Sequence, residues 1–204
     1  MTLPRLIAVV RSDGADECRT LVRGLIAAGI EGVEITMTVP GGVGLIEEFA
    51  ASDAVVGAGT VLDPRTAADC LKAGARFVVS PVTDPDVARV VHDAGRPYVG
   101  GALTPMEIVQ ALRVGCEAVK IFPIGAVGGP RYLRAVREPF PELPAVVSGG
   151  VAPADAPEYL AAGARAVCMG GALLDRDAGR RGDVAAVAAK AAGVLSQIEE
   201  ARSA

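Results

Sequence analysis

Several kinds of residue are scarce or absent in this chain of 204 residues. It has no tryptophan, its aromatic content is 3%, and His92 is the single histidine. Seventeen of its twenty basic side chains are arginine, so Lys72, Lys120 and Lys190 are the only lysines. No apolar run approaches the roughly 20 residues that a membrane-spanning helix needs. The sequence therefore excludes a helical membrane protein.

The four cysteines do not form a metal-binding pattern. Cys18, Cys70, Cys116 and Cys168 are widely spaced, and no CxxC pair is present. One histidine and isolated cysteines do not supply the ligands of a zinc site. His92 is expected near the end of a helix, as a surface residue. We therefore expect reduced, mostly buried thiols, no bound metal and no cofactor.

The charge pattern argues against two classes of partner. The formal net charge is −4 and the charges are scattered without a basic stripe, so we expect no nucleic-acid partner. The first ten residues, MTLPRLIAVV, lack the long apolar region and the cleavage site of a secretion signal. We expect a cytoplasmic protein with no membrane partner.

Short apolar runs recur along the chain, and helical segments lie between them. Each run is nearly continuously apolar and rich in Val and Ile, which is typical of parallel strands buried on both faces. The helical segments carry start signals at Asp63-Pro64 and in a capping box from Thr104 to Glu107. The predicted strands are 6–10, 32–36, 55–60, 77–81, 98–102, 118–123, 145–150 and 166–171.

Glycine marks the predicted helix ends. Gly29, Gly74, Gly95, Gly115 and Gly163 each follow a helical segment and precede an apolar run, which is the position of a left-handed C′ cap. Their spacings correspond to one or two units of about twenty residues. Eight such units predict a compact (β/α)₈ TIM barrel, with 1–204 as a single domain and the last few residues disordered. A doubly wound open sheet is the alternative, but no dinucleotide fingerprint accompanies it.

Lys120 interrupts the apolar segment AVKIF in the sixth predicted strand. Strand alternation places its side chain on the same face as Ala118 and Phe122. A lysine buried there would lose its proton more readily, and the neutral amine attacks carbonyl carbon to form a Schiff base. The alternative is a structural lysine that extends outward between helices or pairs with a carboxylate.

Two other strand-end residues fit imine chemistry, because the catalytic residues of such barrels lie at the carboxyl ends of the strands. Glu34, on one face with Thr36, can shuttle protons for a buried lysine. It can equally be a structural partner of Lys120 or Arg11. Arg11 ends the first predicted strand, where its planar guanidinium suits a substrate carboxylate. It can also simply pair with the adjacent segment SDGADE.

Two glycine pairs, Gly149-Gly150 and Gly170-Gly171, follow the seventh and eighth predicted strands. Barrels commonly bind phosphate at this place, through backbone N–H groups and a helix N-terminus. Glycine pairs also serve ordinary tight turns. Their occurrence on two adjacent strands favours the phosphate interpretation.

The segments GVEITMTVP, VVGAGTVLDP, FVVSP, VKIFP and SGGV occur in this order. With them, the chain resembles the 2-keto-3-deoxy-6-phosphogluconate (KDPG) aldolases and their 4-hydroxy-2-oxoglutarate (KHG) relatives over nearly its whole length. The resemblance implies a class I, metal-independent aldehyde-lyase that acts on a small 2-keto acid and assembles as a homotrimer. It makes Lys120 the Schiff-base lysine and Glu34 the general acid/base.

The resemblance also implies the residues that bind substrate. Thr60, Pro81 and Phe122 would line the pocket for the pyruvyl group, and Arg11 would hold its carboxylate. The residues that would border a phosphate are Ser148, Gly149, Gly150, Gly170 and Gly171.

The chain departs from the family pattern at several positions. Thr38 stands where some members have an arginine, and Arg11 matches members that supply this arginine from the first strand. Ser148 replaces the threonine that often precedes the first glycine pair. Ala172 follows Gly171 where members often have a serine. The helix that usually precedes the first strand is largely missing.

The reaction implied by the resemblance is cleavage of KDPG to pyruvate and glyceraldehyde 3-phosphate. Alternatives with the same chemistry are KHG, 2-keto-3-deoxy-6-phosphogalactonate and an unphosphorylated 2-keto-3-deoxy acid. A different phosphate-binding barrel enzyme, such as a phosphosugar isomerase, would not need Lys120. A barrel that only binds a ligand would not need to keep Lys120 and Glu34.

Overall fold

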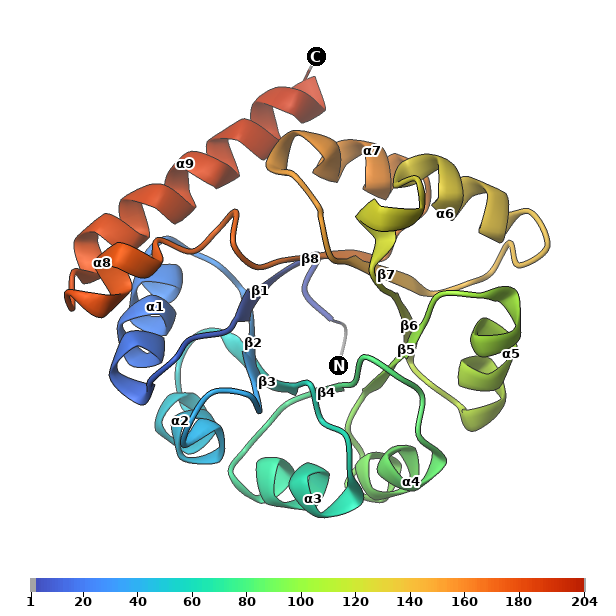
Figure 1. The fold of residues 1–204 in the computed structure, drawn as a ribbon, viewed down its shortest axis with the longest axis horizontal. Coiled ribbons are helices and arrows are strands. Elements are labelled where there is room, and N and C mark those ends of the chain that lie inside the picture. The colour runs from blue at the N-terminus through green and yellow to red at the C-terminus, as the bar shows by residue number, and fades with distance from the viewer. Residues whose placement is uncertain (1–2, 204) are drawn as a thin grey trace.

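The computed structural model of the chain describes residues 3–203, and its strands close into a parallel barrel in the order β1 to β8. Helices surround the barrel on the outside (Figure 1). This confirms the predicted single-domain (β/α)₈ TIM barrel. The strands are β1 (Leu6–Val10), β2 (Gly32–Thr36), β3 (Val55–Gly59), β4 (Val78–Val79), β5 (Tyr98–Ala102), β6 (Ala118–Ile121), β7 (Ala145–Ser148) and β8 (Ala166–Met169).

The outer ring consists of one helix after each strand and a long final helix that packs on α1. Short 3₁₀ turns at Ile124–Val127 and Pro153–Asp155 precede α6 and α7. The helices are α1 (Ala15–Ala27), α2 (Gly42–Phe49), α3 (Pro64–Lys72), α4 (Pro85–Asp93), α5 (Pro105–Val114), α6 (Pro130–Arg137), α7 (Ala156–Ala161), α8 (Arg176–Arg180) and α9 (Val184–Ser203).

The predicted helix signals are confirmed. Asp63 caps α3 by accepting the backbone N–H of Thr66, and Thr104 and Glu107 form the capping box of α5. The five glycines at the predicted helix ends all have positive φ, between 64° and 100°. Side chains with a Cβ rarely adopt this conformation, so glycine ends these helices at low energetic cost.

Several strands are shorter than the sequence predicts. β3 ends at Gly59 because Thr60 has a φ of 57°, and β7 ends at Ser148 because Gly149 has a φ of 86°. Both residues turn the chain out of the extended conformation. β4 keeps only two residues. Helix α9 runs to Ser203, where we expected disorder over the last few residues, and residue 204 lies outside the described part.

The apolar residues form two layers, as expected for a barrel with strands buried on both faces. The outer layer lies between strands and helices, with Tyr98 and Ile121 among its buried members. The inner layer fills the barrel and contains Ile7, Phe77, Val79, Val99, Ala118, Val146, Ala166 and Cys168.

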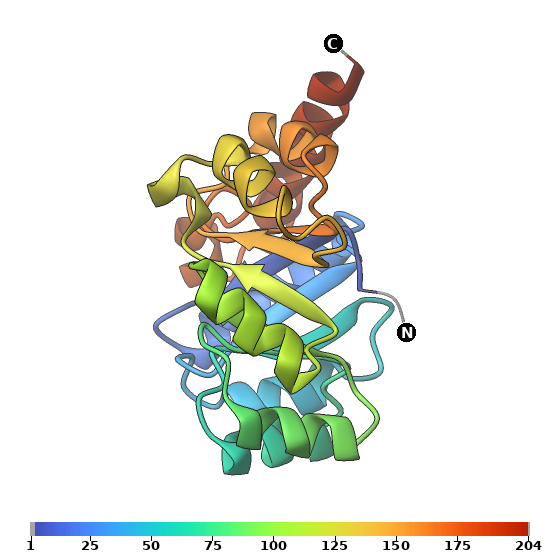
Figure 2. The same ribbon diagram turned by 90° about the vertical axis from the view of Figure 1, so that its right-hand side faces the viewer.

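Figure 2 shows the barrel from the side, with the strand arrowheads pointing to the left. The loops that follow the strands therefore lie together at one end of the barrel, where catalytic groups of this fold are found. All four cysteines are free and buried, as predicted, and His92 lies exposed in the last turn of α4. Among residues 3–203, no helix is long and apolar enough to cross a membrane.

Candidate active site

Lys120 and Glu34 meet inside the barrel. Lys120 lies on β6 and Glu34 on β2, and the lysine Nζ is 3.6 Å from the glutamate Oε1. Their side chains are 8% and 0% exposed, respectively. The inward direction predicted for Lys120 by strand alternation is what brings it to the carboxylate. The structure thus brings together the two residues that the sequence singles out for chemistry.

The Glu34 carboxylate is buried without hydrogen bonds. Within the described part of the chain, neither of its oxygens has a hydrogen-bond partner. Nearly all buried polar groups are paired, so an unpaired buried carboxylate costs free energy of folding. Its attraction to the Lys120 ammonium offsets part of this cost. The free oxygens remain available to accept protons from a bound molecule or water.

Two glycines make room for the polar groups of the site. A Cβ on Gly59 of β3 would lie 2.0 Å from the Glu34 Oε1, so any larger residue would displace the carboxylate. On β5, a Cβ on Gly101 would lie 2.1 Å from the carbonyl carbon of Pro81. Sequence reasoning assigned no role to Gly59 or Gly101. Both glycines lie on predicted strands that neighbour the strands of Glu34 and Lys120, and this position could have indicated that they make room in the site.

Phe122 and Cys168 provide a low-polarity surrounding for Lys120. The Lys120 Nζ lies 5.7 Å from the centroid of the half-exposed Phe122 ring, within the range of a cation–π contact. Burial, with a smaller contribution from the Glu34 charge, raises the pKa of the Cys168 thiol to about 12, against an opposing effect of Lys120. The thiol is therefore neutral and does not compete with Lys120 as a nucleophile.

Arg11 reaches the mouth of the barrel from the end of β1. Its Nη2 donates a 3.3 Å hydrogen bond to Oγ1 of Thr60, which directly follows β3. A threonine with a φ of 57° is strained, and such strain is most often found at functional sites. Thr36 instead bonds the Val10 carbonyl and contacts Thr38, so these two hydroxyls help to fix the ends of β1 and β2.

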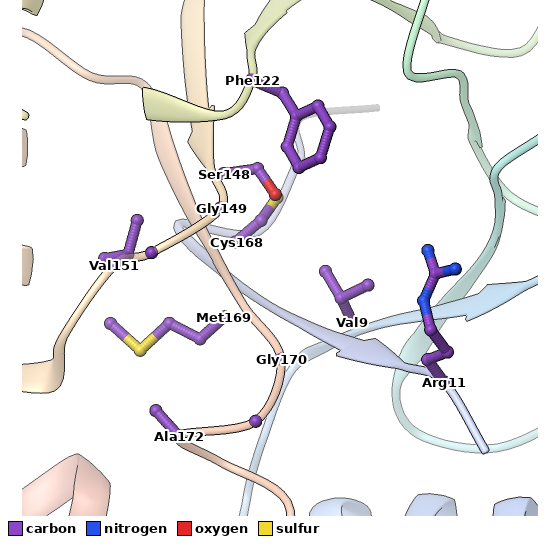
Figure 3. A pocket seen from close by; sticks show the side chains of 12 residues that line it. Val9, Arg11, Phe122, Ser148, Gly149, Val151, Cys168, Met169, Gly170 and Ala172 are labelled. Atoms are coloured by element: carbon purple, nitrogen blue, oxygen red, sulfur yellow. The ribbon is translucent and has the colours of Figure 1, made fainter. Parts of the chain in front are cut away.

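A cavity of about 520 Å³ opens at this end of the barrel. Figure 3 shows Arg11 and Val9 on one side of it and the loops that carry Gly149 and Gly170 on the other. Val9 and Cys168 were not predicted from the sequence to line this cavity. Strand alternation could have found them, because both have an inward position on their predicted strands. The residues that line it are Val9, Arg11, Phe122, Ser148, Gly149, Gly150, Val151, Cys168, Met169, Gly170, Gly171 and Ala172.

The remaining predicted substrate residues, Thr60 and Pro81, do not line this cavity but lie next to residues that do. Pro81 and Phe122 line an adjacent cavity of about 190 Å³, and Phe122 stands between the two. Thr60 lines neither cavity, but its hydroxyl accepts a hydrogen bond from Arg11, which lines the larger one. Each predicted site residue therefore lies at the same end of the barrel.

The far wall of the larger cavity is made of the two glycine-rich loops and uncharged side chains, Val151 and Met169 among them (Figure 3). Gly149 and Gly150 have φ values of 86° and 74°, and a Cβ on Gly149 would lie 2.9 Å from the Phe122 ring. Ser148 supplies a hydroxyl in this wall and is 6% exposed. Of the described residues that line the cavity, Arg11 is the one with a charged side chain. This wall can bind an anion mainly through backbone N–H groups.

The chain matches the family model of the aldolases described as KDPG and KHG aldolase over residues 1–190. It is 34% identical over 201 residues to 2-dehydro-3-deoxy-phosphogluconate aldolase of Pseudomonas aeruginosa, covering 97% of this chain and 91% of that protein. It is 30% identical over 186 residues to KHG/KDPG aldolase of Escherichia coli K12, covering 90% and 87%.

A solved structure of KDPG aldolase from Legionella pneumophila aligns with a TM-score of 0.84 and 26% identity, over 93% of each chain. That structure holds pyruvate as a covalent carbinolamine intermediate, captured at low pH. The match to the family model, the two sequence relatives and the arrangement of Lys120 and Glu34 agree. The chain belongs to the KDPG and KHG aldolase family.

Proposed function

We propose that this enzyme is a class I aldolase that cleaves KDPG to pyruvate and glyceraldehyde 3-phosphate. The observation that carries the proposal is the buried lysine and carboxylate, Lys120 and Glu34, at 3.6 Å inside the barrel. An amine in reach of a proton acceptor is what imine formation requires. Relatives named for this substrate support the choice of KDPG.

The first step joins the substrate to Lys120. After Glu34 takes a proton from Lys120, the Nζ lone pair attacks the C2 ketone carbon, and the carbinolamine hydroxyl leaves as water with the proton held by Glu34, which gives a protonated imine between C2 and Nζ. Arg11 holds the C1 carboxylate, with Thr60 fixing the guanidinium from the other side. Thr60, Pro81 and Phe122 form the pocket for the three-carbon pyruvyl part.

The second step breaks the C3–C4 bond. Glu34 takes the proton of the C4 hydroxyl through a water molecule, and the C4 oxygen forms the aldehyde carbonyl. The electron pair of the broken bond moves through C3 and C2 to the imine nitrogen, which gives an enamine. Protonation at C3 and hydrolysis of the imine then release pyruvate and restore Lys120. Both oxygens of Glu34 lack a hydrogen bond within the described residues, which supports this role.

The phosphate end of the substrate would face the wall opposite Arg11. Backbone N–H groups act as donors for an anion, and the Ser148 hydroxyl adds one more. The residues proposed to border the phosphate are Ser148, Gly149, Gly150, Gly170 and Gly171.

A second candidate is KHG, whose far end is a carboxylate. It is favoured by the composition of the far wall, because the one charged side chain among the described lining residues, Arg11, lies on the opposite side of the cavity. A phosphate dianion would gain no cationic side chain there. We expect kcat/KM to be higher for KDPG if the backbone groups bind phosphate. Equal kcat/KM for KDPG and KHG would show that the phosphate is not recognised.

We also propose that the enzyme acts in the cytoplasm as a homotrimer. Its four free, buried cysteines are compatible with a reducing compartment. Exposed apolar side chains on three successive units, Leu62, Val82 and Met106, support an oligomeric contact on that side of the barrel. They are 56%, 52% and 76% exposed.

Borohydride reduction in the presence of pyruvate tests the proposed chemistry. The imine is reduced to a stable amine, so digestion and mass spectrometry are expected to find the pyruvyl adduct on the Lys120 peptide. Lys72 and Lys190 serve as internal controls within the same chain, and a sample without pyruvate gives the background. An unmodified Lys120 peptide in the reduced, inactivated enzyme would rule the mechanism out.

A further inference from the structure

Two loops at the mouth of the barrel come from neighbouring strands, because β1 pairs with β8. The loop after β1 begins at Arg11 and leads into α1, and the loop after β8 begins at Gly170 and leads into α8. Both loops line the larger cavity. Their separation therefore sets the width of the site on this side.

An ion-pair cluster joins the two loops. Arg176, the first residue of α8, donates from Nε to Glu17 Oε1 at 2.9 Å and from Nη2 to Asp13 Oδ2 at 2.8 Å. Its Nη2 also lies 3.3 Å from Glu17 Oε2, and Arg180 adds a contact to Glu17 at 3.7 Å. One guanidinium thus bridges two carboxylates that flank the start of α1.

Glu17 is the centre of this cluster. Its side chain is only 6% exposed, and its Oε2 accepts the backbone N–H of Asp13 at 3.3 Å. The N-cap residue of α1, Gly14, offers no side-chain cap, so Glu17 takes over part of that function. A buried carboxylate of this kind depends on its arginine partner, since it would otherwise be an unpaired charge.

Helices α1 and α8 pack closely against each other beside the cluster. A Cβ on Gly179 of α8 would lie 3.0 Å from Leu21 and 3.2 Å from Glu17 Cγ, both on α1. Glycine at 179 therefore lets α8 pack directly against α1. Figure 1 shows α8 beside α1 at the outside of the barrel.

We propose that Glu17 and Arg176 are positioning residues that form a clamp between the two loops. The clamp fixes the backbone that carries Arg11 and the distance between Arg11 and the Gly170-Gly171 pair. Through this distance it sets the affinity for the 2-keto acid. This proposal rests on the proposed function, which identifies the ligand as a 2-keto acid. Glu17 and Arg176 do not line the cavity, so they act through Arg11 and take no part in bond making.

Arg176→Gln removes both bridges and tests the clamp in steady-state cleavage of KDPG. We expect KM to rise about tenfold while kcat changes less than about threefold, because Lys120 and Glu34 lie on other strands. Arg134→Gln is the matched control, since Arg134 makes a similar 2.9 Å pair with Glu158 between α6 and α7, away from the loops. The control is expected to keep the wild-type KM.

A double-mutant cycle with Arg11→Gln separates positioning from general destabilisation. If Arg176 acts through Arg11, the double variant is expected to have a KM no higher than that of Arg11→Gln alone. A KM for the double variant equal to the product of the two single effects would overturn the proposal. An unchanged KM in Arg176→Gln would overturn it as well.

Asp13→Asn provides a milder variant that keeps the buried Glu17 paired. Only one of the two bridges is weakened, so KM is expected to rise about threefold, less than in Arg176→Gln. This variant decides the question if Arg176→Gln does not fold.

Hydrogen exchange of the ligand-free protein separates failure of the clamp from failure of the proposed function. In Arg176→Gln, amides 12–14 and 170–174 are expected to lose protection together, whereas Arg134→Gln leaves both loops unchanged. Loss of protection in one loop alone would refute the clamp. A wild-type enzyme that does not cleave 2-keto acids would instead refute the proposed function, and the exchange result would still decide the clamp.

Discussion

Lys120→Arg is expected to lower kcat for KDPG cleavage by at least about 10⁴-fold, which is the scale seen when a catalytic nucleophile is removed. Arginine keeps a positive charge near Glu34, but its guanidinium stays protonated and does not form an imine with a ketone. The variant therefore separates the charge of Lys120 from its nucleophilicity. Single-turnover cleavage and borohydride trapping with pyruvate would both be measured.

The small number of lysines gives this experiment a clean control. Lys72 is exposed in the last turn of α3, so Lys72→Arg is expected to keep wild-type kcat and stability. Arginine is larger than the lysine it replaces in the barrel, and overpacking costs about 1–3 kcal/mol. Rates should therefore be measured well below the unfolding midpoint. Cleavage by Lys120→Arg within tenfold of wild type would contradict imine catalysis.

Glu34→Gln is expected to lower kcat by about 10²–10⁴-fold, the range for loss of a general acid/base. The amide has nearly the shape of the carboxyl group but cannot take a proton from the C4 hydroxyl. Its effect should fall mainly on kcat, because Glu34 is not proposed to bind the C1 carboxylate or the phosphate. Pre-steady-state cleavage of KDPG compares the bond-breaking step directly.

The thermal stability of Glu34→Gln should change much less than its kcat. Glu34→Gln relieves the desolvation cost of a fully buried carboxylate that lacks hydrogen bonds within residues 3–203, but it also leaves the Lys120 ammonium, 8% exposed, without its ion-pair partner. Because these two effects oppose each other, we expect the thermal unfolding midpoint of Glu34→Gln, measured by calorimetry, to stay close to that of wild type. A large loss of stability together with wild-type kcat would show that Glu34 is a structural partner of Lys120.

Much of the fold could be predicted from local patterns. Apolar runs predict strands and left-handed glycines predict helix ends, because both features depend only on a short stretch of chain. Strand alternation then placed Lys120 and Glu34 inside the barrel, because successive side chains of a strand point alternately to its inner and outer face. The boundary at Thr60 was missed because a threonine with positive φ contradicts its usual preference.

The parts of the site that could not be predicted depend on contacts between distant segments. The 3.6 Å approach of Lys120 to Glu34 depends on barrel closure and stagger, which no local pattern encodes. The bridge between Glu17 and Arg176 joins residues 159 positions apart. From the sequence, Glu17 was considered only within the segment SDGADE, as an alternative partner of Arg11, and Arg176 was assigned no role.

The glycines of β3 also affect the register in which this strand pairs with its neighbours. Gly57 and Gly59 leave hollows that are filled by the Phe77 ring and the Glu34 carboxylate, respectively. A slip of β3 by one residue would turn Ala58 inward and close these hollows, because every side chain would change face. A one-residue slip of β3 is therefore disfavoured by shape, because it would remove the room for the Glu34 carboxylate and the Phe77 ring.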